Sequence, residues 1–179
     1  PTMTSEQFQQ ASLPARWHYF IARHPLTILL GYLTVFMYGM CIQAFLRKPL
    51  LHWDAMAALA IHGILIAGLL MLGWDALWLC LLAPLMLACC LGSYLFYAQH
   101  NFPGCRLELR DNWNHAKAAL QSSSYLKMGP LMNWFTGNIG LHHIHHLNAR
   151  IPFYRLPEAM AQLPELQKPA STTLHPADV

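Results

Sequence analysis

Four histidines lie close together in the stretch GNIGLHHIHHLN, residues 137–148. His142, His145 and His146 form an HxxHH pattern, and residues three and four positions apart share one face of a helix. Three imidazoles on one face can converge on a metal ion, and neutral imidazole suits iron, zinc, copper and nickel. The pattern therefore predicts a metal-binding helix whose ligands include these three histidines.

Two further histidines bear on this site. On a helix of about 3.6 residues per turn, His143 is turned about 100° from His142, which favours a position behind the ligands or on the surface. His100, in the stretch YAQHNFPG, is a candidate fourth ligand because it follows an apolar segment at the end where the cluster should also lie. The alternatives are a histidine run that binds no metal and, for His100, an interfacial imidazole bonded to a headgroup or to backbone.

The chain that carries these histidines is unusually apolar. Of its 179 residues, 55% are hydrophobic and only 11% are charged, whereas a soluble globular domain has about 25% charged residues. The shortage of charge predicts a membrane protein. The basic residues are scattered and the net charge is only +3, so nucleic acid is not an expected partner. The five cysteines form no CxxC pair and are expected to be free thiols.

Three apolar stretches without Asp, Glu, Lys or Arg have about the 20 residues that a helix needs to cross the bilayer core. They are residues 25–45, 55–72 and 76–98. Only three residues separate the second from the third, so these two should form an antiparallel helical hairpin. The predicted fold class is all-α: a polytopic membrane protein with a transmembrane helical hairpin and a cytoplasmic, histidine-rich helical region at residues 99–165.

Charge indicates which way this hairpin points. Basic residues lie beyond its two outer ends and none lies in its turn: Arg47, Lys48, Arg106, Arg110 and Lys117. By the positive-inside rule the outer ends, and with them the histidine cluster, face the cytoplasm. Segment 25–45 has basic residues on both flanks, so we expect a re-entrant or interfacial helix there. An ordinary spanning helix is the alternative.

The remaining chain is more polar, and the helices predicted in it are short. Residues 111–121 predict a short helix with Asp111 or Asn112 as its N-cap, and another helix is expected around residues 158–163. The stretch from Trp134 into the histidine cluster is expected to be helical. The last ten residues are expected to be disordered.

A few polar side chains are candidates for orienting the predicted ligands. They are Asn138, Asn148, Glu108 and Asp111. A turn former, a helix cap or a solvated face would explain them equally well. His62 lies inside segment 55–72, where an ionisable group is a candidate for function; the alternative is a neutral imidazole that hydrogen-bonds between the two hairpin helices.

Three stretches, GNIGLHHIHHLNARIPFYRL, YAQHNFPG and WNHAKAALQSSSYLKMGPLMNWFTGNIG, resemble the C-terminal half of the integral-membrane fatty acid desaturases. They are most like the bacterial acyl-lipid type that introduces Δ12/ω6 double bonds. The resemblance covers most of residues 1–160. His142, His145 and His146 match the third histidine box of that family, HxxHH, and His100 matches an additional histidine after the last pair of membrane helices.

The resemblance implies two iron ions held by histidines from three boxes, dioxygen as co-substrate, a membrane-lipid acyl chain as substrate and the bacterial inner membrane as location. The chain matches only the third box, so a fragment that lacks the first two is expected. The second and third boxes of the family face the same metal pair, so an even number of crossings separates them and segment 25–45 should not cross. The HPGG haem motif of a fused cytochrome b5 is missing from the sequence, which implies a separate ferredoxin-type electron donor.

Two other functions remain open. A related diiron hydroxylase acting on alkanes, sterols or carotenoids would use the same boxes. A metal transporter would place polar ligands along a path inside the bilayer, whereas the three apolar segments contain one histidine and no carboxylate. Four aromatic residues would line an acyl channel or, as the ordinary explanation, the membrane interface: Trp134, Phe135, Phe153 and Tyr154.

Overall fold

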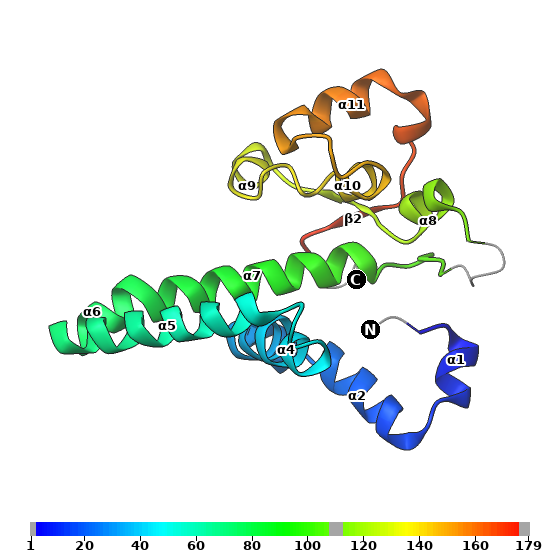
Figure 1. The fold of residues 1–179 in the computed structure, drawn as a ribbon. Helices are drawn as coiled ribbons and strands as arrows, with labels where there is room; N and C mark the ends of the chain where they lie inside the picture. The colour runs from blue at the N-terminus through cyan, green and yellow to red at the C-terminus, as the bar shows by residue number, and fades with distance from the viewer. Residues whose placement is uncertain (1–2, 108–112, 176–179) are drawn as a thin grey trace. The chain divides into compact units, whose positions relative to one another are not determined.

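The structure is a computed structural model that describes residues 3–107 and 113–175. It is mostly helical, with two strands of three residues each, which confirms the predicted class in its coarse form. The described residues form two compact units, one made of Ser12–Leu95 and the other of residues 3–11 with the described part of 96–175 (Figure 1). All five cysteines are free thiols, as expected.

The first unit is a succession of helices with short breaks. They are α2 (Leu13–Arg23), α3 (Pro25–Leu29), the π-helix η1 (Tyr32–Ile42), α4 (Gln43–Arg47), α5 (Trp53–Leu72), α6 (Trp74–Leu77), the π-helix η2 (Trp78–Leu82) and α7 (Ala83–His100), whose last residues, from Phe96 on, belong to the second unit.

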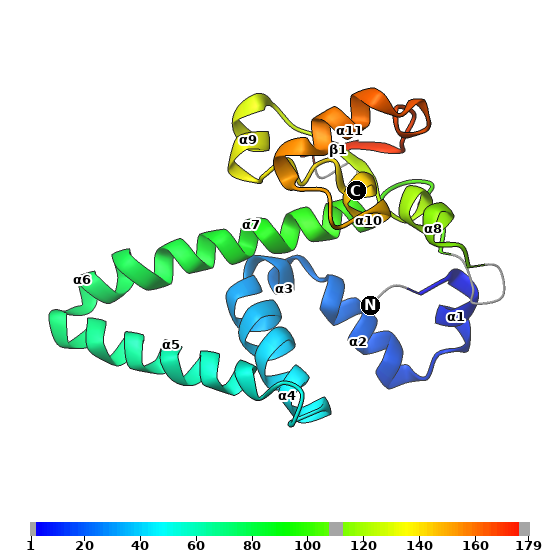
Figure 2. The same ribbon diagram turned by 45° about the horizontal axis from the view of Figure 1, so that its top comes forward.

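The predicted hairpin is made by α5 and the continuous helix α6–η2–α7. Its turn is a single residue, Gly73, with a φ of +117° that favours glycine, and Figure 2 shows the two arms diverging from it. Trp53–Leu72 and Trp74–His100 are long and apolar enough to cross a membrane, with mean hydropathies of 2.3 and 2.1. In the most apolar 18 residues of each helix, only 6% and 0% of the residues are buried within the protein, so most of the apolar side chains there are exposed, as lipid-facing side chains are.

Segment 25–45, which forms α3, η1 and most of α4, is joined to α5 by a buried polar contact. The Tyr32 hydroxyl and His62 Nε2 form a hydrogen bond, and both residues are buried. The Phe36 ring lies 6.2 Å from the His62 ring, nearly edge-on. A hydrogen bond from His62 to the other hairpin helix was the predicted alternative. That prediction is wrong about the partner, because the imidazole bonds to the Tyr32 hydroxyl of η1. The re-entrant topology of this segment stays a prediction.

The same segment approaches α7 on backbone atoms. A Cβ added at Gly31 would overlap Ser93 Oγ and would lie 2.6 Å from the Cys89 carbonyl oxygen. A backbone carbonyl cannot rotate away as a side chain can, so only glycine allows this approach. Segment 25–45 therefore contacts α5 through the hydrogen bond of Tyr32, and it approaches α7 closely at Gly31, directly before the π-helix.

Replacing Gly31 with alanine is expected to destabilise the first unit by about 1–3 kcal/mol, as overpacking of a close contact does. The check is a lower melting temperature in detergent micelles. Gly63→Ala, inside α5, is the matched control: a Cβ there meets nothing within 4 Å, and alanine is favoured over glycine in a helix by about 1 kcal/mol. Equal melting temperatures of the two variants would contradict the close approach of η1 to α7.

The second unit consists of short elements around a small apolar core. They are α1 (Ser5–Gln10), the end of α7, α8 (His115–Gln121), β1 (Tyr125–Lys127), α9 (Pro130–Phe135), α10 (His142–Leu147), η4 (Phe153–Arg155), α11 (Leu156–Gln162), η5 (Pro164–Leu166) and β2 (Ser171–Thr173). Leu141, Ile144, Leu156 and Leu166 form the core. This core packs α10, which carries the HxxHH pattern, against the C-terminal elements.

The two strands correct the expectation that the last ten residues are disordered. β2 pairs in parallel with β1, with Leu126 opposite Thr172. The Ser124 and Thr172 hydroxyls, both buried, lie 3.1 Å apart. Backbone pairing with a distant strand orders Ser171–Thr173, and no local sequence pattern indicates it.

The helices of this unit differ from the predictions mainly at their ends. α8 begins at His115 and is capped by Asn114, whose side chain accepts from the Lys117 amide. The predicted caps Asp111 and Asn112 lie outside the described residues. α11 confirms the helix expected around residues 158–163 and begins two residues earlier.

A turn breaks the helix expected from Trp134 into the histidine cluster. Gly137 and Asn138 have φ angles of +59° and +56°, a left-handed conformation that cannot continue an α-helix. The chain therefore forms two separate helices, α9 and α10. Because of this break, the direction of α10, which carries the histidines, does not depend on the direction of α9.

Candidate metal centre

Three imidazoles converge on one point of the second unit. The Nε2 atoms of His142 and His100 lie 3.0 Å apart, those of His142 and His146 3.0 Å, and those of His146 and His100 3.3 Å. A neutral imidazole has a single N–H and a single lone pair, so three facing ring nitrogens cannot all satisfy one another. A cation at their centre would satisfy all three lone pairs.

The spacing of the three nitrogens fits a bound metal ion. Metal–imidazole bonds are about 2.0–2.1 Å for zinc, so two ligands at right angles lie about 3.0 Å apart and two at the tetrahedral angle about 3.4 Å apart. The observed 3.0–3.3 Å falls in this range. The donor set is all nitrogen, which suits iron, copper, nickel or zinc. These residues therefore fit a transition-metal site.

His100 is oriented by a backbone hydrogen bond at the end of α7. Its Nδ1 lies 2.9 Å from the Ser122 carbonyl oxygen, and because a carbonyl can only accept, Nδ1 carries the proton. The lone pair is then on Nε2, the atom that faces the other two histidines. A second contact holds this end of α7 in the unit, since the buried Gln99 donates from Nε2 to the Ile139 carbonyl at 2.8 Å.

His142 and His146 are presented by the six-residue helix α10. Ile144, on the opposite side of that helix, is fully buried in the core, and this fixes which face of α10 turns toward His100. Burial, with the neighbouring His146 and His100 next in importance, lowers the pKa of His142 to about 3. Burial and the neighbouring imidazoles also lower the pKa of His146. The His142 ring is therefore neutral near pH 7, the form that binds a metal.

Comparison with known proteins shows the family of the chain. Residues 4–177 match the family described as fatty acid desaturase. A protein of Bacillus subtilis (strain 168) named "Fatty acid desaturase" is 30% identical over 177 residues, which cover 96% of this chain and 49% of that protein. The chain belongs to the fatty acid desaturase family. It spans about half the length of the curated relative it matches, and no solved structure matches it.

His145, the second histidine of the HxxHH pattern, lies outside the converging group. The metal-binding group found among the described residues contains His100, His142 and His146. The His145 ring lies nearly parallel to that of His142, with centroids 5.7 Å apart, and it is half-buried. The sequence pattern placed His145 with His142 and His146, and its role as a ligand stays a prediction.

His143 is not a surface residue. Its side chain is fully buried, and its Nε2 lies 3.3 Å from the Leu166 carbonyl oxygen, to which it must donate. Among the described residues, its Nδ1 is a buried nitrogen without a hydrogen-bond partner. Of the two positions expected for His143, the surface one is wrong. The residue lies behind the ligands and ties α10 to η5.

The polar residues proposed to orient the ligands do other work where the structure describes them. Asn138 donates from Nδ2 to the Phe153 carbonyl at 3.1 Å, and Asn148 accepts from the Arg150 amide at 3.1 Å after the end of α10. The turn-former and cap explanations hold for these two. Glu108 and Asp111 lie outside the described residues.

The residue that orients His100 had no signal in the sequence. Ser122 acts through its backbone carbonyl, which any residue type would supply. Only the fold could reveal it.

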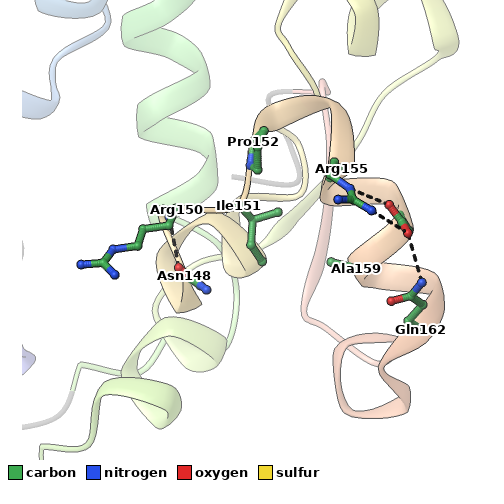
Figure 3. A pocket seen from close by; sticks show the side chains of 8 residues that line it. Asn148, Arg150, Ile151, Pro152, Arg155, Ala159 and Gln162 are labelled. Atoms are coloured by element: carbon green, nitrogen blue, oxygen red, sulfur yellow. Dashed lines mark hydrogen bonds and ion pairs between the residues drawn. The ribbon is translucent and has the colours of Figure 1, made fainter.

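A shallow open hollow lies beside the end of α10, with a volume of about 300 Å³ (Figure 3). It is lined by Asn148, Arg150, Ile151, Pro152, Arg155, Glu158, Ala159 and Gln162. Arg155 and Glu158 form a two-point ion pair across part of it, at 2.9 and 3.1 Å. None of the three converging imidazoles lines this hollow, and its charged rim does not suit an acyl chain, so we assign it no substrate.

Proposed function

We propose that the protein is an iron- and O2-dependent membrane desaturase that introduces a double bond into a fatty acyl chain of a membrane lipid. The observation that carries the proposal is the convergence of three imidazoles in a member of the fatty acid desaturase family. The overall reaction removes two hydrogens from adjacent methylenes. With two electrons and two protons from a donor, these hydrogens reduce one O2 to two waters.

The chemistry of the substrate explains why a metal is needed. A carbon–hydrogen bond in the middle of an acyl chain is neither acidic nor polarised, so side-chain acids and bases cannot break it. Bound iron would supply the activation of dioxygen, and the protein supplies binding and orientation. The chain's own part is to aim three imidazoles at one point.

The residues behind the ligands perform that part. The Ser122 carbonyl holds the proton of His100 on Nδ1, burial keeps His142 neutral, and the packing of Ile144 sets the rotation of α10. Such contacts behind a ligand typically change metal affinity or activity by about 10–100-fold when removed.

Two irons need more ligands than this group provides. We propose that His100, His142 and His146 hold one ion and that His145 contributes to the other, together with histidines from further boxes of the whole protein. The electrons are proposed to come from a separate ferredoxin-type donor. This division is supported by the position of His145 beside His142 but outside the converging group.

We place the site at the cytoplasmic face of the bacterial inner membrane. Support comes from Arg47 and Lys48 before α5, from Arg106 after α7, and from a turn at Gly73 without Lys or Arg. Segment 25–45 is proposed not to cross the bilayer, so that α5 and α7 provide the two crossings before the metal site.

The metal content of the purified 179-residue chain tests the division of ligands. Loaded anaerobically with Fe(II) and separated from free metal, it is expected to hold at most one iron per chain, because three ligands converge at one point. Elemental analysis against protein concentration gives the ratio. Two irons per chain would refute the proposal that this chain holds only one of the two ions.

The proposed reaction is tested by the fatty acids of cells that express the full-length gene. New dienoic acyl chains are expected by gas chromatography with mass detection, and a variant with His146→Ala should produce none. Hydroxylated products in place of dienes would make the protein a hydroxylase and overturn the proposed reaction.

A further inference from the structure

Large apolar side chains gather on two short elements of the second unit, α9 and η4. Each is between 60% and 76% exposed. They are Leu131, Trp134, Phe135, Phe153 and Tyr154, and we call them the aromatic patch. Exposed apolar side chains in such a group mark a surface that binds something.

The two elements are held together as one surface. The turn after α9 contains Gly137 and Asn138 in the left-handed conformation, and Asn138 donates to the Phe153 carbonyl at 3.1 Å. A Cβ at Gly137 would lie 3.4 Å from the Phe153 ring. The backbone directly after α9 therefore packs on Phe153 of η4.

This surface is tied to the end of a helix long and apolar enough to cross a membrane. Ile139 directly follows the turn between α9 and α10, and its carbonyl accepts a 2.8 Å hydrogen bond from Gln99. Gln99 is the second-last residue of Trp74–His100, the longer of the two candidate spans. The patch is thus fixed within a few residues of the point where the chain leaves the apolar span.

Residue types favour a lipid bilayer as the occupant. Trp and Tyr have apolar rings with one polar atom and concentrate at the depth of the headgroups. Arg150 stands three residues before Phe153, so a cationic group borders the patch where lipid phosphates would lie. Figure 3 shows the Arg150 guanidinium pointing away from the hollow that its backbone helps to line.

We infer that the aromatic patch inserts into the interfacial layer of the phospholipid bilayer and anchors the unit that carries the three imidazoles. The inference rests on the membrane location proposed above and does not depend on the reaction. The patch is a third attachment to the membrane besides α5 and α7. It holds the candidate metal centre at the depth where acyl chains begin.

The test labels the unmutated chain with 5-fluorotryptophan and reconstitutes it in nanodiscs of phosphatidylcholine and phosphatidylglycerol. Single Trp→Phe changes assign the ¹⁹F signals of Trp134, Trp113 and Trp78. Spectra are recorded with a nitroxide-bearing phosphatidylcholine and, separately, with a water-soluble gadolinium chelate. Trp113 is the matched control, because it belongs to the same unit and is also exposed. Trp78 lies within a candidate span and reports on insertion itself.

The expected result is that the lipid nitroxide broadens the Trp134 signal beyond detection and the gadolinium chelate leaves it sharp, with the opposite behaviour for Trp113. If Trp78 responds to the lipid nitroxide and Trp134 responds only to the chelate, the patch faces water and the inference fails. Protection of Trp134 from both reagents would mean that protein covers the patch, which also overturns it. If Trp78 does not respond to the lipid nitroxide, the membrane location itself is wrong.

Discussion

Replacing His142 with alanine is expected to abolish tight metal binding by this chain. His142 Nε2 lies 3.0 Å from the Nε2 atoms of both His100 and His146, so it takes part in both of the shortest contacts of the group. Structural zinc sites with four ligands bind with about 10–16 kcal/mol, which is about 2.5–4 kcal/mol for each ligand. At 1.4 kcal/mol per factor of ten, the loss is about 10²–10³-fold in affinity. Competition titration with Co(II) and a chromophoric chelator measures it.

An exposed histidine elsewhere provides the control for this loss. His18→Ala removes an imidazole from α2, outside the unit that holds the site, and should leave the affinity unchanged. In the full-length enzyme, His142→Ala should also remove the desaturated product. An affinity of His142→Ala equal to that of His18→Ala would show that the three nitrogens do not bind the metal.

Replacing His143 with alanine is expected to destabilise the second unit by at least about 3 kcal/mol. The change leaves a cavity at a fully buried position and removes the donor to the Leu166 carbonyl. Large-to-small core changes and buried unpaired acceptors each cost a few kcal/mol, about 2–5 and 1–3 respectively. Thermal unfolding in detergent, with a chelator present so that metal binding does not contribute, gives the difference.

The neighbouring position on the same helix is a matched control. His145 is half-buried and its imidazole ring stacks beside that of His142 without a hydrogen bond in the described contacts. His145→Ala should therefore lower the metal-free stability by less than about 1 kcal/mol, as changes away from buried polar contacts do. If His143→Ala unfolded at the same temperature as His145→Ala, the bond to Leu166 would not hold α10 in place.

The contact between the π-helix and His62 shows that an apolar pattern predicts a helix but not the partners of that helix. The run of residues 25–45 predicted a helix, and its hydrophobicity says nothing about which helices it touches. Tyr32 finds His62 because two elements 30 residues apart pack together. Gly31 permits a close backbone approach that depends on where Cys89 lies. Contacts of this kind have no local signature.

Properties with a local physical cause were determined by the sequence. An uncharged run of about 20 residues is long enough for a membrane helix, and the spacing of His142 and His146 places both on one face of a helix whatever surrounds it. The short link around Gly73 made the second and third apolar segments a hairpin. Family membership followed from the same local stretches around His100 and the HxxHH pattern.

The tertiary structure decided what depends on residues far apart in the chain. His100 meets His142 across 42 residues and His146 across 46, while His145, inside the same pattern, stands aside. His143 is buried and donates to the carbonyl of Leu166, a residue 23 positions further along the chain. The sequence pattern alone left a surface position open for it. Helical periodicity sets only the direction in which a side chain points from the axis of its helix. Which neighbour it faces is settled by the packing of the whole unit.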